Sequence, residues 1–270
     1  MSRSIVLLGC LLLLSSCVSI QDEKKLTVQK ELAPSGKLRL AAVLAPIGSA
    51  VLVGKDEKTG QYAGVPVEIA AELARQIEVP LEVIPFKTGN EIRASAAKDV
   101  WDVVFTPQNP ETEKFFALGP VYLIVESGYL VPPNSRIRTL ADVDQPGVRV
   151  VARANSPQGR HLRSSLKNAM LIGVATADEQ LALVRSGKAD VLTAGKTYLL
   201  LQAKEWPGSR VLDGGYSREH VVIGLPHGRP KAMEYLNEFV ENAKVSGVIR
   251  RAYDKLGFHD LPVPPPVVRK

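Results

Sequence analysis

Along this chain, segments whose apolar residues have the spacing of a helix alternate with aliphatic-rich segments typical of strands. Ile69, Leu73 and Ile77 are spaced by four residues behind Pro66, which predicts a helix with one buried face. Aliphatic-rich runs before and after it predict strands. The elements predicted in this part of the chain are a strand at 37–44, a helix at 66–78, a strand at 81–86, a helix at 91–98 and a strand at 101–106. This order predicts a parallel sheet with helices packed on its faces.

A second series of the same kind follows residue 131. Its predicted elements are a strand at 148–152, a helix at 159–167, a strand at 169–173, a helix at 178–186 and a strand at 190–193. The elements expected after these are a helix at 199–203, strands at 210–212 and 221–225, and closing helices at 230–244 and 248–256. The stretches 123–131 and 219–225 read as long extended connections. Two α/β units are therefore expected, with two crossings between them.

The first residues depart from this pattern. Arg3 precedes an apolar run over 5–14, which is about half of the roughly 20 residues that a membrane-spanning helix needs. The run therefore indicates a cleaved export signal at 1–16. The sequence 14–17 (LSSC) resembles a bacterial lipobox, in which Cys17 would carry the lipid; Cys10 also matches, but 5–9 is too short for the apolar core of a signal. An ordinary secretory peptide without lipid is the alternative.

The two ends flanking the folded part are expected to be peripheral. Residues 17–35 have mixed charge and no sustained period, as expected of a tether. Residues 261–270 contain four prolines and favour an extended conformation. Both cysteines of the chain lie in the signal region, so the folded part has no disulfide and no thiolate metal site.

Composition and charge exclude some classes of protein. The 270 residues are 45% hydrophobic and 23% charged, which excludes an intrinsically disordered chain. The net charge is +6, and residues 132–218 carry all of it, with 13 Lys and Arg against 7 Asp and Glu. No basic helix with interleaved aromatics appears, so nucleic-acid binding does not explain the charge. The positive charge is better suited to steering small anions or to contact with an anionic membrane surface.

Several segments together resemble the solute-binding proteins of ABC importers, in the branch of polar amino-acid receptors. The segments are 60–65 (GQYAGV) leading into 67–74 (VEIAAELA), 187–191 (GKADV), and 139–143 (TLADV) ahead of 147–151 (GVRVV). Their order and spacing carry the resemblance, which spans about 36–258. It implies the α/β, two-lobe fold of type II periplasmic binding proteins, with lobe one at 36–128 plus 222–260 and lobe two at 129–221.

The resemblance also implies a function. The chain would be a periplasmic, lipid-anchored and monomeric receptor that captures a small solute between its lobes and delivers it to an ABC permease. Ligand binding would favour the closed form by contacting both lobes at once. No cofactor, metal or nucleic acid is implied.

Two features by which the family's amino-acid receptors hold their ligand are missing here. The arginine that clamps the α-carboxylate aligns with Thr112, which cannot form a bidentate ion pair. The acid that receives the α-ammonium would follow the strand at 190–193, where 193–196 reads TAGK and Lys196 would repel an ammonium group. A third feature survives, a helix-opening loop at 153–159 (RANSPQG) that can receive an anion on backbone N–H groups beside Arg153.

A small polar, anionic ligand is therefore expected rather than an ordinary zwitterionic amino acid. The candidate ligand-binding residues are Ile47, Thr106, Gln108, Thr112, Arg153, Ser156, Gly159, Gly195 and Lys196. No aromatic residue lies at 45–49, which argues against a flat ring stacked there.

Other chemistries find little support. Gly195, Lys196 and Thr197 follow a strand, but a phosphate-binding P-loop needs a glycine where Asp190 stands. The four histidines have no metal-ligand spacing. No nucleophile elbow appears, and we expect no enzyme.

Two alternative functions stay open. The first is a sensory receptor for a membrane kinase or a chemoreceptor, which the sequence does not separate from a transport receptor. The second is a periplasmic lyase like cyclohexadienyl dehydratase, because some relatives of these receptors are dehydratases. Glu68, Glu111 or His161 would then act as the general acid or base.

Overall fold

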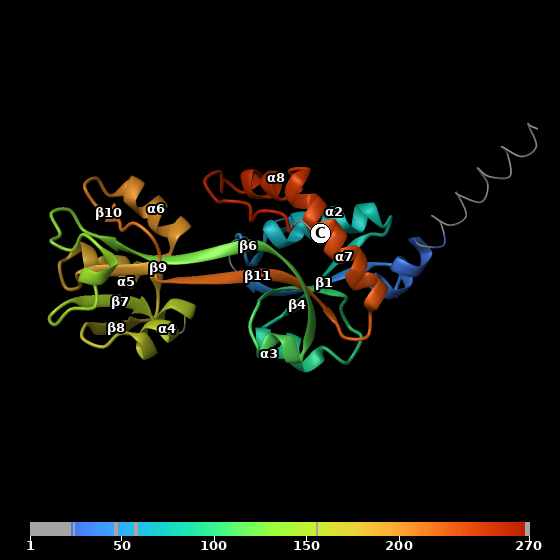
Figure 1. Cartoon of the computed structure of the whole chain (residues 1–270), viewed down its shortest axis with the longest axis horizontal. Coiled ribbons are helices and arrows are strands. Elements are labelled where there is room, and N and C mark those ends of the chain that lie inside the picture. Colours follow the sequence, from blue (N-terminus) through green and yellow to red (C-terminus); the bar gives the residue numbers. More distant parts are fainter. Residues whose placement is uncertain (1–22, 24, 46–47, 57–58, 155, 268–270) are drawn as a thin grey trace, which may run out of the picture. The chain divides into compact units, whose positions relative to one another are not determined.

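The computed structural model describes residues 23, 25–45, 48–56, 59–154 and 156–267, which form two compact units. Unit 1 comprises Met1–Leu123 and His220–Lys270, and unit 2 comprises Ile124–Glu219. The chain passes from one unit to the other in two long strands, β6 (Phe116–Val131) and β11 (Ser217–Pro226), shown in Figure 1. The sequence predicts these boundaries after residues 128 and 221, within a few residues of those observed. In the part of the chain that the structure describes, no helix is long and apolar enough to cross a membrane.

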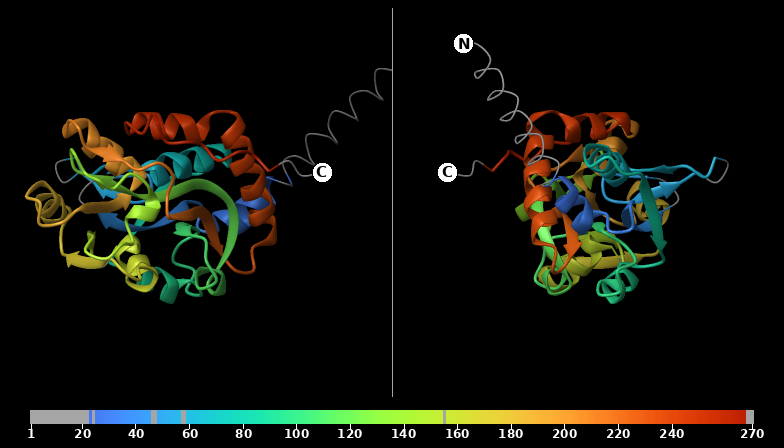
Figure 2. Two further views of the ribbon diagram at one scale, coloured as in Figure 1. Left: turned by 60° about the vertical axis from the view of Figure 1, so that its left-hand side comes forward. Right: turned by 90° about the vertical axis from the view of Figure 1, so that its right-hand side faces the viewer.

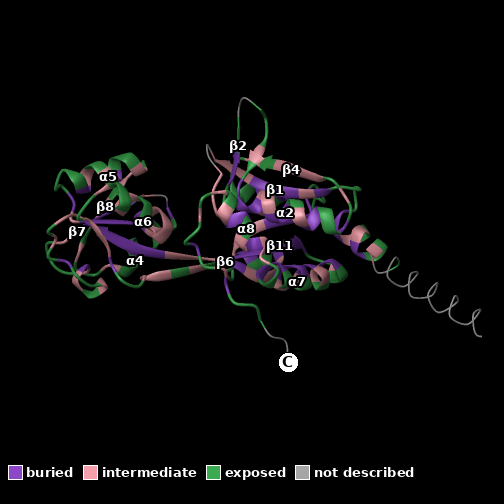
Figure 3. Ribbon diagram, turned by 90° about the horizontal axis from the view of Figure 1, so that it is seen from above, coloured by how far each residue is buried: buried purple, intermediate pink, exposed green. Residues whose placement is uncertain are grey.

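Unit 1 is built on a mostly parallel sheet around β1 (Leu38–Ala45). Its other strands are β2 (Val53–Lys55), β3 (Tyr62–Ala63), β4 (Leu81–Phe86) and β5 (Val103–Pro107). β1 runs parallel to β2, β4 and β5, while β11 runs antiparallel to β5 and β3 antiparallel to β2. Half of the residues of β1 are buried and none is exposed, which fits a strand that is aliphatic except for Arg39 (Figure 3).

Helices cover this sheet. They are α2 (Val65–Gln76), α3 (Gly89–Ser95), α7 (Pro230–Val245) and α8 (Val248–Lys255), with a short 3-10 turn, η1 (Thr112–Lys114). Helix α8 packs against both α2 and α7 (Figure 2). On another side of the unit, Trp101 packs edge-on against Phe116, and its indole N–H donates to Ser95 Oγ at 2.8 Å.

The N-terminal part of unit 1 corrects one expectation. The sequence analysis expected a tether over 17–35, but residues 25–32 are helical in the structure. Val28 and Leu32 are buried, and Glu31 Oε2 accepts hydrogen bonds from the backbone N–H groups of Lys231 and Ala232, at 2.7 and 2.9 Å, in the first turn of α7. The local pattern does not predict this helix, because it is short and rich in charged residues and is stabilised by contacts with residues about 200 positions away.

The proline-rich C-terminal segment has neither helix nor strand over 260–267, as its composition predicts. It lies on unit 1 all the same. Arg250 donates to the carbonyl oxygens of Leu261 and Phe258, both at 2.6 Å, and the N–H of Val267 donates to Glu241 at 2.7 Å.

Unit 2 repeats the layered arrangement. Its elements are η2 (Leu140–Asp142), β7 (Arg149–Arg153), α4 (Pro157–Ser165), β8 (Met170–Val174), α5 (Ala177–Arg185), β9 (Val191–Gly195), α6 (Lys196–Glu205) and β10 (Arg210–Val211). Strand β7 is parallel to β8 and β9, while β9 and β10 run antiparallel to β6. Successive residues of each strand point to opposite faces of the sheet and pack into two separate hydrophobic cores. One core surrounds Val150 and Leu162, and the other surrounds Val151 and Leu199.

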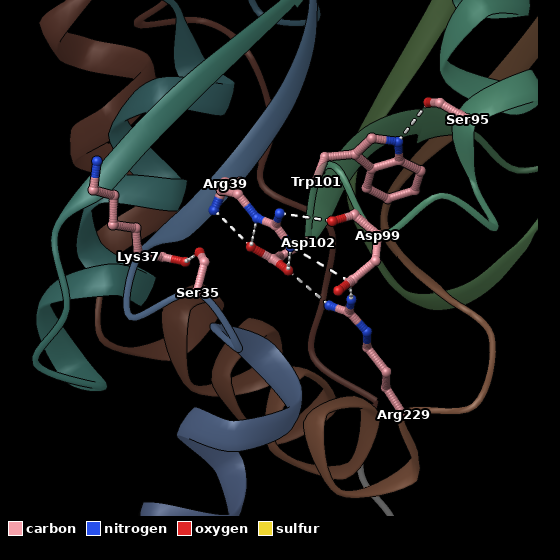
Figure 4. Close-up of polar contacts among 8 residues, drawn as sticks. All are labelled: Ser35, Lys37, Arg39, Ser95, Asp99, Trp101, Asp102 and Arg229. Carbon is pink, nitrogen blue, oxygen red and sulfur yellow. Dashed lines mark hydrogen bonds and ion pairs between the residues drawn. The ribbon is translucent and has the colours of Figure 1, made fainter.

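Each unit contains an arginine–aspartate ion pair of the same kind. The arginine lies at the start of one strand, and the aspartate directly precedes the neighbouring strand. Arg39, at the start of β1, receives the Asp102 carboxylate on its backbone N–H at 3.0 Å and on its guanidinium Nε and Nη2 at 2.9 Å (Figure 4). Arg149, at the start of β7, holds Asp190 through the same three groups at 2.9, 2.8 and 2.7 Å. Of these two pairs, the one in unit 1 is the more deeply buried. Its carboxylate also binds a second arginine, with 2.8 Å between Arg229 Nη1 and Asp102 Oδ1.

Most predicted elements are confirmed within two or three residues, and so is the α/β class. The short strands β2 and β3 were not predicted, and the extended connections predicted at 123–131 and 219–225 lie within β6 and β11, which begin earlier, at Phe116 and Ser217.

Candidate functional site

The candidate ligand-binding residues of unit 2 lie at one edge of its sheet. Strands β7 and β9 are parallel neighbours, with Val151 level with Leu192, so their carboxyl ends reach the same edge. Arg153 ends β7, and Gly195 ends β9. Helices α4 and α6 begin just beyond them. The carboxyl ends of parallel strands, with helix N-termini beside them, are where α/β sheets commonly bind small ligands.

Arg153 is exposed at this edge. Among the described residues, its guanidinium has no hydrogen-bond or ion-pair partner. It lines an open hollow of about 560 Å³ together with Ala154, Ser156, Pro157, Gly173, Val174 and Ala175. Its charge also acts on the phenol of Tyr198 on α6, where it partly offsets the rise in pKa that burial causes. Arg153 is thus an exposed cation beside a helix start, without a partner among the described residues.

Ser156 and Gly159 shape the beginning of α4. Ser156 Oγ accepts from the N–H of Gly159 at 3.0 Å and donates to the carbonyl of Arg153 at 2.8 Å, so it caps the helix and closes the loop. A Cβ on Gly159 would lie 2.2 Å from the Arg153 carbonyl oxygen, so only glycine fits there. Because Pro157 has no N–H, Gln158 supplies the first-turn N–H that has no acceptor among the described residues. Both predicted residues therefore hold the loop's shape, and the helix start offers fewer donors than the sequence suggested.

Lys196, predicted as a cation of the site, is paired with a carboxylate in the structure. Its Nζ lies 3.3 Å from Glu126 Oε2 on β6 and 3.4 Å from the carbonyl oxygen of Gly214. Arg218, on β11, approaches the other oxygen of Glu126 at 3.4 Å. Gly195 precedes Lys196 at the cap of α6, which has no side-chain capping bond. The charge of Lys196 is therefore balanced by a carboxylate that the sequence analysis did not identify.

A polar network joins this edge to the interior of unit 2. Gln158 Nε2 donates to Ser127 Oγ at 3.0 Å, which fastens the first turn of α4 to β6. Thr193 Oγ1 donates to the Gly128 carbonyl at 3.0 Å, so it accepts from the Tyr216 hydroxyl at 2.6 Å. Burial raises the pKa of Tyr216 and keeps this hydroxyl protonated.

A sequence signal for Glu126 did exist. It is the single charged residue in the sixteen-residue strand β6, and a charge inside an otherwise apolar strand needs a partner. Ser127 and Gln158 carried no comparable signal, since each becomes informative only once the fold brings them together.

The candidates from unit 1 are placed as follows. Thr106 is buried near the end of β5, and Gln108 is exposed just beyond it. Thr112 is buried, and its hydroxyl donates within the 107–112 loop, 2.8 Å from the Pro107 carbonyl and 2.9 Å from that of Asn109, while accepting from the Asn109 N–H at 3.1 Å. The hydroxyl of Thr112 is thus used by its own loop. Ile47 and Cys17 lie outside the described residues.

The residues weighed for a lyase are each in contact with another side chain. Glu68 is paired with Lys255 at 2.8 Å, Glu111 lies 3.7 Å from Arg93, and the ring of His161 stacks on Tyr216 with 5.4 Å between centroids. Within the part of the chain that the structure describes, no group of three or more His, Cys, Asp or Glu side chains could hold a metal ion.

Comparisons with known proteins agree with this architecture. Residues 52–259 match the family of bacterial extracellular solute-binding proteins, family 3. A glutamine-binding protein of Geobacillus stearothermophilus is 25% identical over 175 residues, 63% of this chain and 66% of that protein, just under two thirds of its length. A cyclohexadienyl dehydratase of Pseudomonas aeruginosa is 24% identical over 249 residues, 90% of each chain.

Solved structures show the same fold. An ancestral amino-acid-binding protein, described as a precursor of cyclohexadienyl dehydratase, has a TM-score of 0.64 at 23% identity and covers 84% of this chain and 97% of its own. A binding component of an ABC transporter from Wolinella succinogenes, complexed with lysine, has a TM-score of 0.66 at 22% identity over 82% and 95% of the two chains. Both are type II periplasmic binding proteins in fold, as the sequence analysis expected.

Proposed function

Since this chain belongs to the bacterial extracellular solute-binding proteins of family 3, we propose that it is an extracytoplasmic receptor that captures a small polar solute and delivers it to an ABC-type permease. The family match over 52–259, a relative named as a glutamine-binding protein and a related structure complexed with lysine support an amino-acid-like solute. The export signal and the lipobox-like sequence at 14–17 support a periplasmic protein anchored by lipid on Cys17.

The ligand of this receptor carries an acid group and is net anionic. The observation that carries this proposal is Arg153, an exposed guanidinium without a partner among the described residues, beside the start of α4 in a hollow of about 560 Å³. A guanidinium binds a carboxylate or a phosphate in a bidentate manner, and the positive end of a helix favours the same charge. The net charge of +6 over 132–218 would steer such a solute toward unit 2.

The test is the substitution Arg153→Ala in a protein spanning residues 18–270. Once isothermal titration with amino acids and dicarboxylates has identified a ligand, Arg153→Ala should weaken its binding at least tenfold, which corresponds to about 1.4 kcal/mol. Arg136→Ala is the matched control, since it removes another exposed arginine of unit 2 and should leave the affinity unchanged. Equal affinity in the wild type and in Arg153→Ala would remove Arg153 from the site.

A dehydratase is the second candidate, favoured by the match over 90% of each chain to the Pseudomonas enzyme. Glu219 adds a chemical reason, because burial raises its pKa against the opposing charge of Arg160, and a carboxylic acid with a raised pKa suits general-acid catalysis. Incubation with a cyclohexadienyl carboxylate, followed by mass spectrometry, decides between the two. Loss of water and carbon dioxide that depends on the protein would establish the enzyme.

A further inference from the structure

Unit 2 contains a carboxylate placed between two cations at the edge where its candidate ligand-binding residues lie. Glu126 Oε2 lies 3.3 Å from Lys196 Nζ, and Glu126 Oε1 lies 3.4 Å from Arg218 Nη2. The Glu126 side chain is 23% exposed and that of Lys196 31% exposed, so both remain within reach of a solute. The cluster formed by Glu126, Lys196 and Arg218 has one negative charge for two positive ones.

The backbone around this cluster restricts the position of the Glu126 side chain. A Cβ on Gly215 would lie 2.4 Å from Glu126 Cγ and 2.8 Å from Oε1, so a side chain at 215 would push the carboxylate away. The next residue, Ser127, accepts the hydrogen bond from Gln158 on α4, which fixes β6 beside the start of that helix. Glu126 therefore has a defined position against the cations rather than a free surface rotamer.

Two further features make the same place attractive to an anion. Helix α6 begins at Lys196, and its first turn has no side-chain cap, so the positive end of its dipole is not neutralised by its own sequence. The carbonyl oxygen of Gly214, 3.4 Å from Lys196 Nζ, holds that ammonium group near Glu126. Two cations, one of them at a helix start, form an arrangement that recognises oxyanions.

We propose that Lys196 and Arg218 form an oxyanion site that Glu126 occupies as an internal anion, and that Glu126 thereby determines which solutes unit 2 accepts. This inference rests on the proposed function and specifies the role of that site's charges. With Glu126 in place, Arg153 is the cation left to bind an acid group of the solute. A second acid group, whether carboxylate or phosphate, has to compete with Glu126 for Lys196 and Arg218.

The test uses inorganic phosphate as the probe and the protein spanning residues 18–270. In equilibrium dialysis at low ionic strength, Glu126→Gln should bind phosphate at least tenfold more tightly than the wild type, because the two cations lose their internal partner. Glu126→Asp, which keeps the charge on a side chain one methylene shorter, should lie between the two. Glu205→Gln is the matched control, since it removes one exposed negative charge from the end of α6 and should leave phosphate binding as in the wild type.

Two double variants assign the gain in phosphate binding to the cluster. Adding Lys196→Ala to Glu126→Gln should return phosphate binding to the wild-type value, whereas adding Arg153→Ala should leave most of the gain. No gain in Glu126→Gln, an equal gain in Glu205→Gln, or a gain that survives Lys196→Ala would each overturn the proposal. Failure of the proposed function would appear differently, as the absence of any solute whose binding depends on Arg153.

Discussion

Asp102 is a fully buried carboxylate held by two arginines, and its counterpart Asp190 in unit 2 is held by one arginine nearer the surface. Both carboxylates accept from the backbone N–H and the guanidinium of an arginine that begins a strand. The two carboxylates differ in exposure, at 0% for Asp102 and 35% for Asp190, and in the second arginine that Asp102 binds. Removing each of them therefore compares a buried network of ion pairs with a single pair that is partly exposed.

The substitution Asp102→Ala should destabilise unit 1 by about 3 kcal/mol, because it leaves the largely buried guanidinium groups of Arg39 and Arg229 with only the exposed carboxylate of Asp99 as a counter-ion. Asp190→Ala should destabilise unit 2 by about 1 kcal/mol or less, since water screens and solvates Arg149. Urea unfolding followed by fluorescence measures both, because Trp101 lies in unit 1 and Trp206 in unit 2. Equal losses from the two substitutions would contradict this account.

At the same residue scale, the sequence predicted the position of Arg153 after a strand but not the contacts of Glu126. Arg153 ends a strand and precedes a serine-proline helix start, so its place follows from local pattern alone. Glu126 acquires its meaning from Lys196 and Arg218, which are 70 and 92 residues away along the chain. Predicting a bare cationic site was therefore incomplete, because a contact across that separation does not appear in any local window.

At the scale of elements, periodicity predicted well wherever burial alone sets the pattern. The strand predicted at 81–86 coincides with β4, and the helix predicted at 230–244 ends one residue before α7. Elements defined by other forces were missed. Strands β2 and β3 are too short to show a period, and β6 is interrupted in sequence by Gly119, Pro120 and Gly128.

The N-terminal helix at 25–32 gives a test of an element that was predicted to be a tether. Leu32 is fully buried, so Leu32→Ala should destabilise unit 1 by about 2–5 kcal/mol through lost burial and the cavity that remains. Leu26, in the same helix, is 55% exposed, and Leu26→Ala should change stability by less than about 0.5 kcal/mol. Thermal or urea unfolding measures the stability of both variants. Equal losses of stability would show that residues 25–32 behave as a tether and not as part of unit 1.

At the scale of the whole molecule, the two units differ in net charge and in the features that each carries. Unit 1 holds both ends of the described chain, including the N-terminal helix through which a lipid on Cys17 would be joined to the folded part. Unit 2 holds the exposed arginine and the cluster of Glu126, Lys196 and Arg218. Under the proposed function, the lipid would therefore be joined to unit 1, and Arg153 and the cluster would face the solute from unit 2.

The most direct measurement is thermal unfolding of residues 18–270 in the presence of single amino acids, dicarboxylates, sugar acids and phosphonates. A receptor saturated at a hundred times the dissociation constant gains about 2.7 kcal/mol, which is a clear upward shift. We expect a net anionic solute, such as a dicarboxylate, a sugar acid or a phosphonate, to produce that shift, and Arg153→Ala to abolish most of it at the same concentration. A shift produced only by zwitterionic or cationic amino acids, or one that Arg153→Ala leaves intact, would contradict the account.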